Sequence, residues 1–176
     1  SGNIATCMQT VTVNDTENPT IACPPDVSVN ADAGLCTAVG VALGVPVTGD
    51  NCSVASVTNN APATFPLGNT TVTWTVTDGS GNFTTCNQIV TVTDNQAPSI
   101  VCPANVSVFA GAGTCTASGV ALGVPATFDN CSVASVTNNA PVTFPLGNTT
   151  VLWTVTDGSG LTATCNQTVT VNDNEL

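Results

Sequence analysis

The feature that most constrains the fold of this chain is an internal repeat with a period of 79 residues. The stretch DNCSVASVTNNAP occurs at Asp50–Pro62 and again, letter for letter, at Asp129–Pro141. The stretch TFPLGNTTV likewise occurs at Thr64–Val72 and at Thr143–Val151. A fixed period of this length indicates that each copy is one structural unit and that the chain is an array of such units.

The repeat frame also predicts the domain boundaries. Residues 19–97 align on residues 98–176 without a gap. Residues 1–18 contain SGNIATCMQTVTVND, which resembles SGNFTTCNQIVTVTD from Ser80 onward. We therefore predict that residues 1–18 are the final strand and linker of a preceding repeat. Residues 19–97 are the first full repeat, and residues 98–176 are the second.

The cysteines follow the same period. Each full repeat has four of them, and Cys7 takes the place of the fourth one of an earlier repeat. The chain contains no histidine and no C-x-x-C pair, so the spacing typical of zinc sites is absent. A unit of this size has only a thin core, and disulfides are the usual staples of such small domains. We expect an oxidising location, extracellular or at the cell surface.

The charge balance excludes several classes of function. The chain has 11 acidic residues and no lysine, arginine or histidine. It cannot neutralise phosphates, so we expect neither nucleic-acid binding nor direct membrane contact. Tyrosine is also absent, so the usual acid–base groups and electrophiles of active sites are missing. We predict that the chain is not an enzyme and that it requires no cofactor.

The hydrophobic pattern predicts a half-buried strand at Thr71–Asp78. Its residues alternate strictly, with Val72, Trp74 and Val76 on one face and threonines on the other. Trp153 stands at the same place in the second repeat. Because both tryptophans alternate with valines that face inward, we predict that Trp74 and Trp153 anchor the core.

Strands are predicted in the rest of each repeat as well. The turn residues DGSGN lead into a second alternating strand at Thr84–Thr93, and shorter strands are predicted at Cys36–Val45 and Ser53–Thr58. No 3.6-residue period is evident. About seven short strands with frequent turn residues are typical of a Greek-key β-sandwich, so the predicted fold class is all-β.

Several motifs together resemble the hyalin repeat, or HYR domain. They are PTIACP from Pro19, FPLGNTTVTWTVTDGSGN from Phe65, and a later cysteine followed by VTV. The resemblance covers both repeats and residues 1–18. It implies immunoglobulin-like sandwiches arranged head to tail and stapled by disulfides, in an extracellular, adhesion-related protein. Near-identical repeats of this style also resemble the giant surface adhesins of Bacteroidota, such as the gliding-motility adhesin filament.

The immunoglobulin-like resemblance implies disulfides between the first and last strands of each repeat. The implied pairs are Cys23–Cys86 and Cys102–Cys165. Cys7 would then bond to a cysteine of a preceding repeat.

The remaining cysteines leave two alternatives open. The pairs Cys36–Cys52 and Cys115–Cys131 would close loops within each repeat. A straight strand between Cys36 and Cys52 would hold them too far apart to bond, however. The alternative pair Cys36–Cys131 would join one repeat to the next.

Aspartates gather in the linkers and turns, where their oxygens are candidate calcium ligands. The linker Thr91–Pro98 resembles the Asp- and Asn-rich joints of cadherins. One candidate site consists of Asp94, the carbonyl of Asn95, Asp129 and Asp157. The equivalent site one repeat earlier consists of Asp15, Asp50 and Asp78. The alternative interpretation is that these residues only form turns and keep strand edges soluble.

The sequence also contains N-x-[ST] motifs, which are glycosylation sites in secreted eukaryotic proteins. The candidates are Asn69, Asn82, Asn105 and Asn148.

Near-identical repeats favour length over distinct binding sites. We therefore predict a stalk or spacer segment of a long extracellular adhesin or filament, which holds an adhesive region away from the cell. Its partners are adjacent repeats of the same polypeptide, with other copies in a filament or bundle as further candidates. One alternative is a self-assembling subunit that donates its N-terminal strand, Asn3–Val13. A second is a module that binds glycans or proteins, with Phe109 and Phe128 as the main differences between the repeats.

Overall fold

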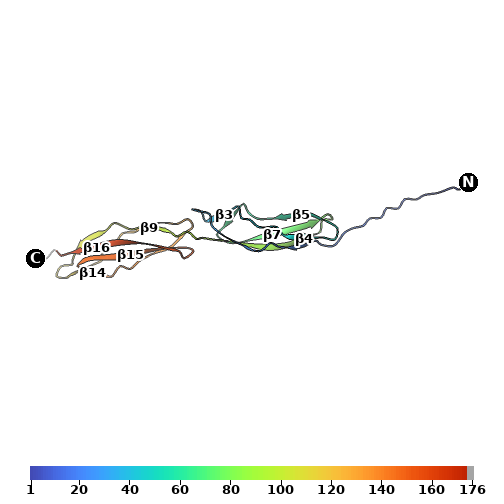
Figure 1. Cartoon of the computed structure of the whole chain (residues 1–176). Coiled ribbons are helices and arrows are strands. Elements are labelled where there is room, and N and C mark those ends of the chain that lie inside the picture. Colours follow the sequence, from blue (N-terminus) through green and yellow to red (C-terminus); the bar gives the residue numbers. More distant parts are fainter. Residues whose placement is uncertain (174–176) are drawn as a thin grey trace. The chain divides into compact units, whose positions relative to one another are not determined.

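The structure is a computed structural model that describes residues 1–173, and it is all-β over these residues (Figure 1). The chain forms two compact units. The first contains residues 1–28, 40–63 and 69–91, and the second contains residues 29–39, 64–68 and the rest of the described chain from residue 92. The units therefore do not coincide with the sequence repeats, because three short segments of the first repeat, residues 29–39, 64–68 and 92–97, belong to the second unit.

Each repeat has eight strands in the same order. The strands of the first repeat are β1 (Thr20–Ala22), β2 (Val27–Asn30), β3 (Thr37–Val39), β4 (Val47–Gly49), β5 (Val54–Asn59), β6 (Thr64–Pro66), β7 (Gly68–Asp78) and β8 (Phe83–Thr93). Those of the second repeat are β9 (Ser99–Val101), β10 (Val106–Phe109), β11 (Thr116–Ser118), β12 (Ala126–Phe128), β13 (Val133–Asn138), β14 (Thr143–Pro145), β15 (Gly147–Asp157) and β16 (Thr162–Asn172).

The strands of each repeat form one four-stranded sheet and two short strand pairs. In the second repeat the four-stranded order is β10-β16-β15-β13, and the pairs are β12-β9 and β11-β14. The first repeat has the same arrangement, β2-β8-β7-β5 with β1-β4 and β3-β6. β15 and β16 form a long antiparallel hairpin, whereas β10 runs parallel to β16 with Val106 opposite Val169.

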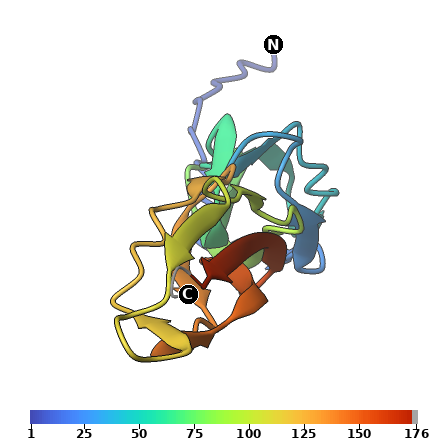
Figure 2. The ribbon, with the colours of Figure 1, turned by 90° about the vertical axis from the view of Figure 1, so that its left-hand side faces the viewer.

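The core lies on the inner face of the long hairpin, as strand alternation requires. Val151, Val155 and Val169 are fully buried. Phe144 of β14 and Ala117 of β11, which come from one of the short strand pairs, are buried in the same core. The four-stranded sheet and the short pairs thus enclose one apolar layer, which makes each repeat a β-sandwich (Figures 1 and 2).

A buried glutamine accompanies each core tryptophan. Trp74 is 7% exposed, and its indole Nε1 donates to Oε1 of Gln88 at 3.0 Å. Gln88 has no exposed surface, and its amide donates to the carbonyls of Pro25 and Leu43. In the second repeat, Trp153 and Gln167 are paired in the same way at 3.0 Å. The indole N–H is therefore satisfied inside the core.

The predicted strand Cys36–Val45 is wrong. β3 ends at Val39, and β4 begins only at Val47. Gly40 and Gly44 lie between them with φ angles of +63° and +80°, which belong to the left-handed region that extended strands do not use. These glycines turn the chain out of the strand direction and divide the predicted strand.

Residues 1–19 form no strand in the structure, so the predicted N-terminal strand is not observed within this chain. None of the described residues forms a helix of the length and apolar character needed to cross a membrane.

Candidate metal centres and the disulfide link

Three aspartates of the second unit meet in one cluster, which we call triad 2. Asp94 follows β8, Asp129 follows β12, and Asp157 is the last residue of β15. Each offers a carboxylate oxygen, and these oxygens all lie within 4.8 Å of one another. The structure thus brings together the three aspartates that the sequence assigned to one candidate site.

Each carboxylate of triad 2 uses one oxygen to fix its own loop. Oδ1 of Asp157 accepts the backbone N–H groups of Ser159 and Leu161, at 2.9 Å and 2.8 Å. Oδ2 of Asp129 accepts those of Cys131 and Ser132, both at 2.8 Å. Oδ1 of Asp94 accepts the backbone N–H of Gln96 and the amide of Asn130. These bonds hold the aspartates in place without a ligand.

The second oxygen of each carboxylate is buried and has no hydrogen-bond partner. These atoms are Oδ2 of Asp94, Oδ1 of Asp129 and Oδ2 of Asp157. Asp157 is 2% exposed and Asp94 is 9% exposed. A buried, unpaired carboxylate oxygen is costly, and three close together repel one another. A cation held between these oxygens would offset both costs, and the chain has no lysine, arginine or histidine side chain that could supply the charge.

The first unit has the equivalent cluster, triad 1, formed by Asp15, Asp50 and Asp78 with oxygens within the same 4.8 Å. Oδ2 of Asp15 and Oδ1 of Asp50 are buried and unpaired. Asp78 differs from Asp157, because its Oδ2 accepts the side-chain amide of Asn82 at 2.7 Å. Burial alone raises the pKa of Asp78, but the hydrogen bonds from Asn82 and Ser80 outweigh burial and hold its pKa below the usual value.

The ligand atoms of both triads lie at a spacing that a calcium ion can accommodate. Calcium binds six to eight oxygens at about 2.3–2.6 Å, so two ligands on opposite sides are up to about 5 Å apart. All the donors here are hard carboxylate oxygens, which suit calcium. Asn95 is exposed, and its carbonyl remains only a predicted ligand.

The structure contains three disulfides among the described residues. Cys23 is bonded to Cys86 and Cys102 to Cys165, which are the pairs that the resemblance implied. Their Cα atoms are 5.8 Å and 5.7 Å apart. The third disulfide joins Cys36 to Cys131, with a Cα separation of 4.8 Å. It connects residues of different repeats, 95 positions apart.

The disulfides Cys36–Cys52 and Cys115–Cys131 are not formed. Cys36 belongs to the second compact unit and Cys52 to the first, so the structure corrects the intra-repeat alternative. Cys52, Cys115 and Cys7 are free and exposed. A hydrogen bond to Asp15, together with the negative charge of that carboxylate, raises the pKa of the Cys52 thiol.

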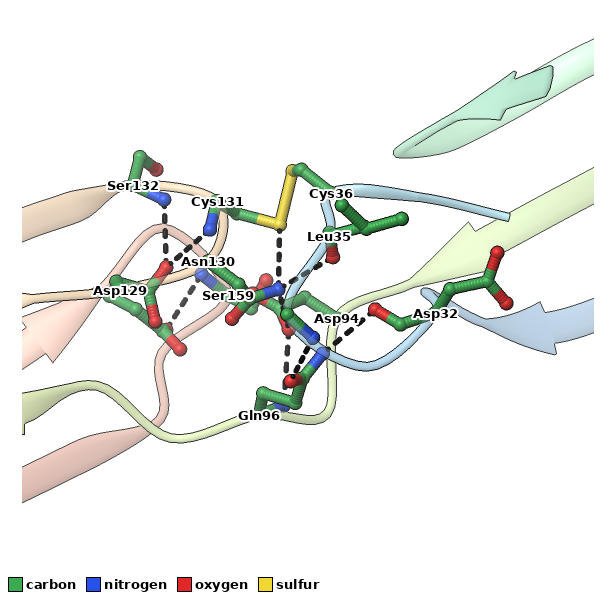
Figure 3. Close-up of a disulfide and its surroundings, with 12 residues drawn as sticks. Asp32, Leu35, Cys36, Asp94, Gln96, Asp129, Asn130, Cys131, Ser132 and Ser159 are labelled. Carbon is green, nitrogen blue, oxygen red and sulfur yellow. Dashed lines mark hydrogen bonds between the residues drawn. A yellow bond between two sulfur atoms is a disulfide. The ribbon is translucent and has the colours of Figure 1, made fainter. Parts of the chain in front are cut away.

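Polar contacts connect the Cys36–Cys131 disulfide to triad 2 (Figure 3). The amide of Asn130 donates to the carbonyl of Leu35 at 2.9 Å and to Oδ1 of Asp94 at 3.2 Å. Gln96 accepts the backbone N–H of Gly34 at 2.8 Å and donates to the carbonyl of Asp32 at 3.2 Å. Sequence reasoning missed these polar residues, because nothing in the repeat pattern distinguishes them from other turn residues.

The candidate glycosylation sites are hydrogen-bonded within the chain. Oxygens of Asn69, Asn105 and Asn148 accept hydrogen bonds from threonines. The amide nitrogen of Asn82 donates to Oδ2 of Asp78 and to the carbonyl of Asp15. A glycan at Asn82 would replace one of these two donated hydrogens. All four positions stay predictions.

A family model identifies both repeats. The HYR domain model matches residues 14–92 and again residues 93–171. The chain belongs to the HYR domain family. HYR domains are extracellular, non-catalytic modules, so this chain is not an enzyme. The matches begin five residues before the predicted boundaries at residues 19 and 98, and the predicted boundaries stay a prediction.

Curated relatives resemble nearly the whole HYR pair. Hyalin of Strongylocentrotus purpuratus is 34% identical over 97% of this chain and 15% of its own length. A sushi, von Willebrand factor type A, EGF and pentraxin domain-containing protein 1 of Rattus norvegicus is 30% identical over 94% of this chain and 5% of its own length. The chain thus spans less than a sixth of these relatives. They are animal proteins, and they give no support to the narrower resemblance to Bacteroidota adhesins.

Solved structures of cadherin repeats align with the HYR pair at low identity. Human mucin-like protocadherin EC1-2 has a TM-score of 0.44 and 12% identity, over 88% of this chain and 98% of that chain. Drosophila N-cadherin EC1-4 has a TM-score of 0.45 and 10% identity, over 90% of this chain and 50% of that chain.

Proposed function

We propose that this chain is a spacer segment of a long extracellular repeat protein and holds an adhesive region away from a cell surface. The observation that carries the proposal is the disulfide between Cys36 of the first repeat and Cys131 of the second. Such a bond limits how far successive repeats can separate, which serves a spacer and has no role in a single binding module. The near-identity of the two repeats supports the same function, because a spacer needs many copies of one part.

The alternatives have weaker support. A donated N-terminal strand would take the place of the last strand of a repeat, but β16 already fills that place between β10 and β15. For a ligand-binding module, Phe109 is exposed and lines a hollow of about 410 Å³ in the second repeat. Phe128 is also exposed, but it is not among the residues that line this hollow.

The mass of the native polypeptide, measured after reduction and denaturation, tests the spacer function. A long repeat array would have a mass of hundreds of kilodaltons. A mass near 17.5 kDa would show a discrete subunit and would overturn the proposal.

We further propose that triads 1 and 2 bind calcium, which would neutralise buried carboxylates and stabilise the loops that carry them. Asp94, Asp129 and Asp157 would hold one ion, and Asp15, Asp50 and Asp78 would hold the other. Calcium at a concentration of about 100 times its dissociation constant stabilises the folded state by about 2.7 kcal/mol per site.

A calcium titration followed by thermal unfolding tests this site. We expect calcium to raise Tm by several degrees, and we expect Asp157→Asn to reduce that rise. The matched control is Asp26→Asn. Oδ1 of Asp26 accepts the backbone N–H of Ile89. The second repeat has asparagine at this position, and Oδ1 of Asn105 accepts the backbone N–H of Thr168 in the same way. If Tm does not respond to calcium, or if both variants respond alike, the calcium proposal fails.

A further inference from the structure

Two of the free cysteines occupy the positions that the Cys36–Cys131 disulfide joins. A shift of one period places Cys36 on Cys115 and Cys131 on Cys52. Both Cys52 and Cys115 are exposed and unbonded. We propose that they are the two ends of an identical disulfide that joins this HYR pair to further repeats of the same design. The partner is therefore a second HYR repeat that carries the complementary cysteine.

The loop of Cys52 already has the conformation of the bonded loop. Oδ2 of Asp50 accepts the backbone N–H groups of Cys52 and Ser53 at 2.9 Å and 2.8 Å. In the bonded copy, Oδ2 of Asp129 accepts the corresponding N–H groups of Cys131 and Ser132 at 2.8 Å. Formation of a disulfide at Cys52 thus requires no new backbone arrangement.

The loop of Cys115 matches that of Cys36 equally well. The N–H of Gly111 donates to the carbonyl of Thr116, and the N–H of Thr114 donates to that of Gly111, at 2.8 Å and 2.9 Å. Around Cys36, the same two bonds are formed by Asp32 and Leu35 with the same lengths. The two loops differ in sequence, and only one is bonded. Their common geometry therefore comes from the fold and not from the disulfide.

A polar side chain beside Cys52 also lacks the partner that its counterpart has. Asn130 donates to the carbonyl of Leu35, in the loop of the bonded Cys36. Asn51 occupies the position of Asn130, but within the described residues its amide donates only to Oδ1 of Asp15, at 3.4 Å. The carbonyl that would complete this arrangement is the equivalent of Leu35 in another repeat. For a copy of this chain, that residue is Thr114.

The third free cysteine provides a built-in comparison. Cys7 is also exposed, but the repeat frame places it on Cys86, which is bonded to Cys23. Each copy of this chain already uses its own Cys23, so another copy offers Cys7 no complementary thiol. Specific pairing therefore predicts Cys52–Cys115 bonds, whereas random oxidation would involve Cys7 as readily.

The bond forms by two thiol–disulfide exchanges with a small-molecule disulfide such as oxidised glutathione. The Cys115 thiolate attacks one sulfur of the reagent, forms a mixed disulfide and releases the first glutathione thiolate. The Cys52 thiolate of the partner then attacks the Cys115 sulfur and releases the second. The two protein thiols lose two electrons and two protons, and the reagent is reduced to two thiols.

The inference rests on the proposed spacer function, but it can fail separately. Incubation of the 176-residue chain with a glutathione redox buffer tests it. We expect a ladder of covalent oligomers on a non-reducing gel, because each copy has both ends. Digestion with an Asp-specific protease, since the chain has no lysine or arginine for trypsin, should identify Cys52–Cys115 as the main new bond.

Cysteine-to-serine variants identify which two thiols form the bond between copies. Cys52→Ser and Cys115→Ser should each abolish the ladder, and an equal mixture of the two should stop at the dimer. The matched control, Cys7→Ser, should keep the full ladder. Abundant Cys115–Cys115 bonds, bonds through Cys7 in a similar amount, or monomers only would overturn the inference. The spacer function would still stand in those cases if the native polypeptide is a long array.

The native polypeptide then distinguishes the two sources of the partner repeat. If its Cys52–Cys115-type bonds lie within one chain, the unreduced protein migrates as a monomer on a denaturing gel. If they lie between copies, the unreduced protein migrates as covalent oligomers. Both outcomes support the link, whereas free thiols at these positions in the native protein would overturn it.

Discussion

At the scale of single residues, the buried glutamines are the least expected part of the fold. Gln88 and Gln167 have no exposed surface, although glutamine is rarely buried in full. Each satisfies an indole N–H and two loop carbonyls at once. The side chain thereby ties the long hairpin to two loops that have no ladder bonds of their own to it.

Replacement of Gln88 by methionine, Gln88→Met, should destabilise the first repeat. Methionine has a similar length, but it leaves the indole N–H of Trp74 and the carbonyls of Pro25 and Leu43 without partners. We expect the free energy of unfolding to fall by about 2–4 kcal/mol, measured by chemical denaturation. Gln9→Met, at an exposed position, is the control and should change little. Equal stability of the two variants would contradict the role of the glutamine.

Part of this network was readable in the sequence. Cys86, Val90 and Val92 share one parity in the predicted strand Thr84–Thr93, and Gln88 shares it too. The alternation predicted the inward-facing tryptophans and valines, because apolar residues report burial directly. Burial of a polar residue on the same face cannot be predicted until its hydrogen-bond partners are known. The two carbonyls that accept from Gln88 lie 45 and 63 positions away in the sequence.

One side-chain difference at the two triads gives a reciprocal test. Asn82 occupies Oδ2 of Asp78, and the second repeat has Leu161 in its place. Asn82→Leu frees an oxygen in triad 1, so we expect it to bind calcium about tenfold more tightly. Leu161→Asn should weaken triad 2 by a similar factor. Isothermal titration calorimetry measures both, and no change in either variant would contradict Asp78 and Asp157 as ligands.

At the scale of elements, the divided strand between β3 and β4 explains why the cysteine pairing was open. The sequence predicted one strand over Cys36–Val45, and a straight strand there would hold Cys36 and Cys52 too far apart to bond. In the structure the strand is broken, and Cys36 still pairs with Cys131. The spacing of cysteines does not say which loops meet in space, so the repeat pattern alone could not decide between the alternatives.

Substitution of Gly44 tests whether this glycine is needed for the turn between β3 and β4. Its φ angle is +80°, and a Cβ atom there would lie 3.3 Å from Cβ of Pro24. Gly44→Ala should therefore destabilise the repeat by about 1–2 kcal/mol from the backbone alone, with a further cost from the contact. Gly40→Ala, with a φ of +63° and open space, should show only the backbone cost. Chemical denaturation compares them, and equal effects would show that the contact with Pro24 does not matter.

At the scale of the whole molecule, every charged side chain is negative. Side-chain ion pairs are absent, so screening can only relieve repulsion. With calcium removed by a chelator, a rise from about 0.05 M to about 0.5 M NaCl should raise Tm by a few degrees. The same rise in salt should have a smaller effect in saturating calcium, because each ion then offsets most of the negative charge of its triad. A fall in Tm with salt would contradict this account.

The disulfide between the repeats should also couple their motions. Cys36→Ser removes the link and leaves Cys23–Cys86 and Cys102–Cys165 intact. Nitrogen-15 relaxation of the variant should give shorter correlation times for the two repeats than in the unaltered chain. Cys115→Ser is the control, since Cys115 is unbonded. If Cys36→Ser leaves the correlation times unchanged, the link does not restrict the repeats.

The three disulfides have one more consequence, which concerns a chain under tension. When the strands come apart, the shortest covalent path between the two ends runs through the Cys23–Cys86 bond, residues 86–102 and the Cys102–Cys165 bond. While both bonds are intact, residues 24–85 and 103–164 cannot add to the distance between the ends. If those two bonds were reduced, the path would lengthen, and the Cys36–Cys131 bond would still bypass residues 37–130. The greatest extension of such a chain is thus set by the redox state of its surroundings, and not by the strength of its sheets.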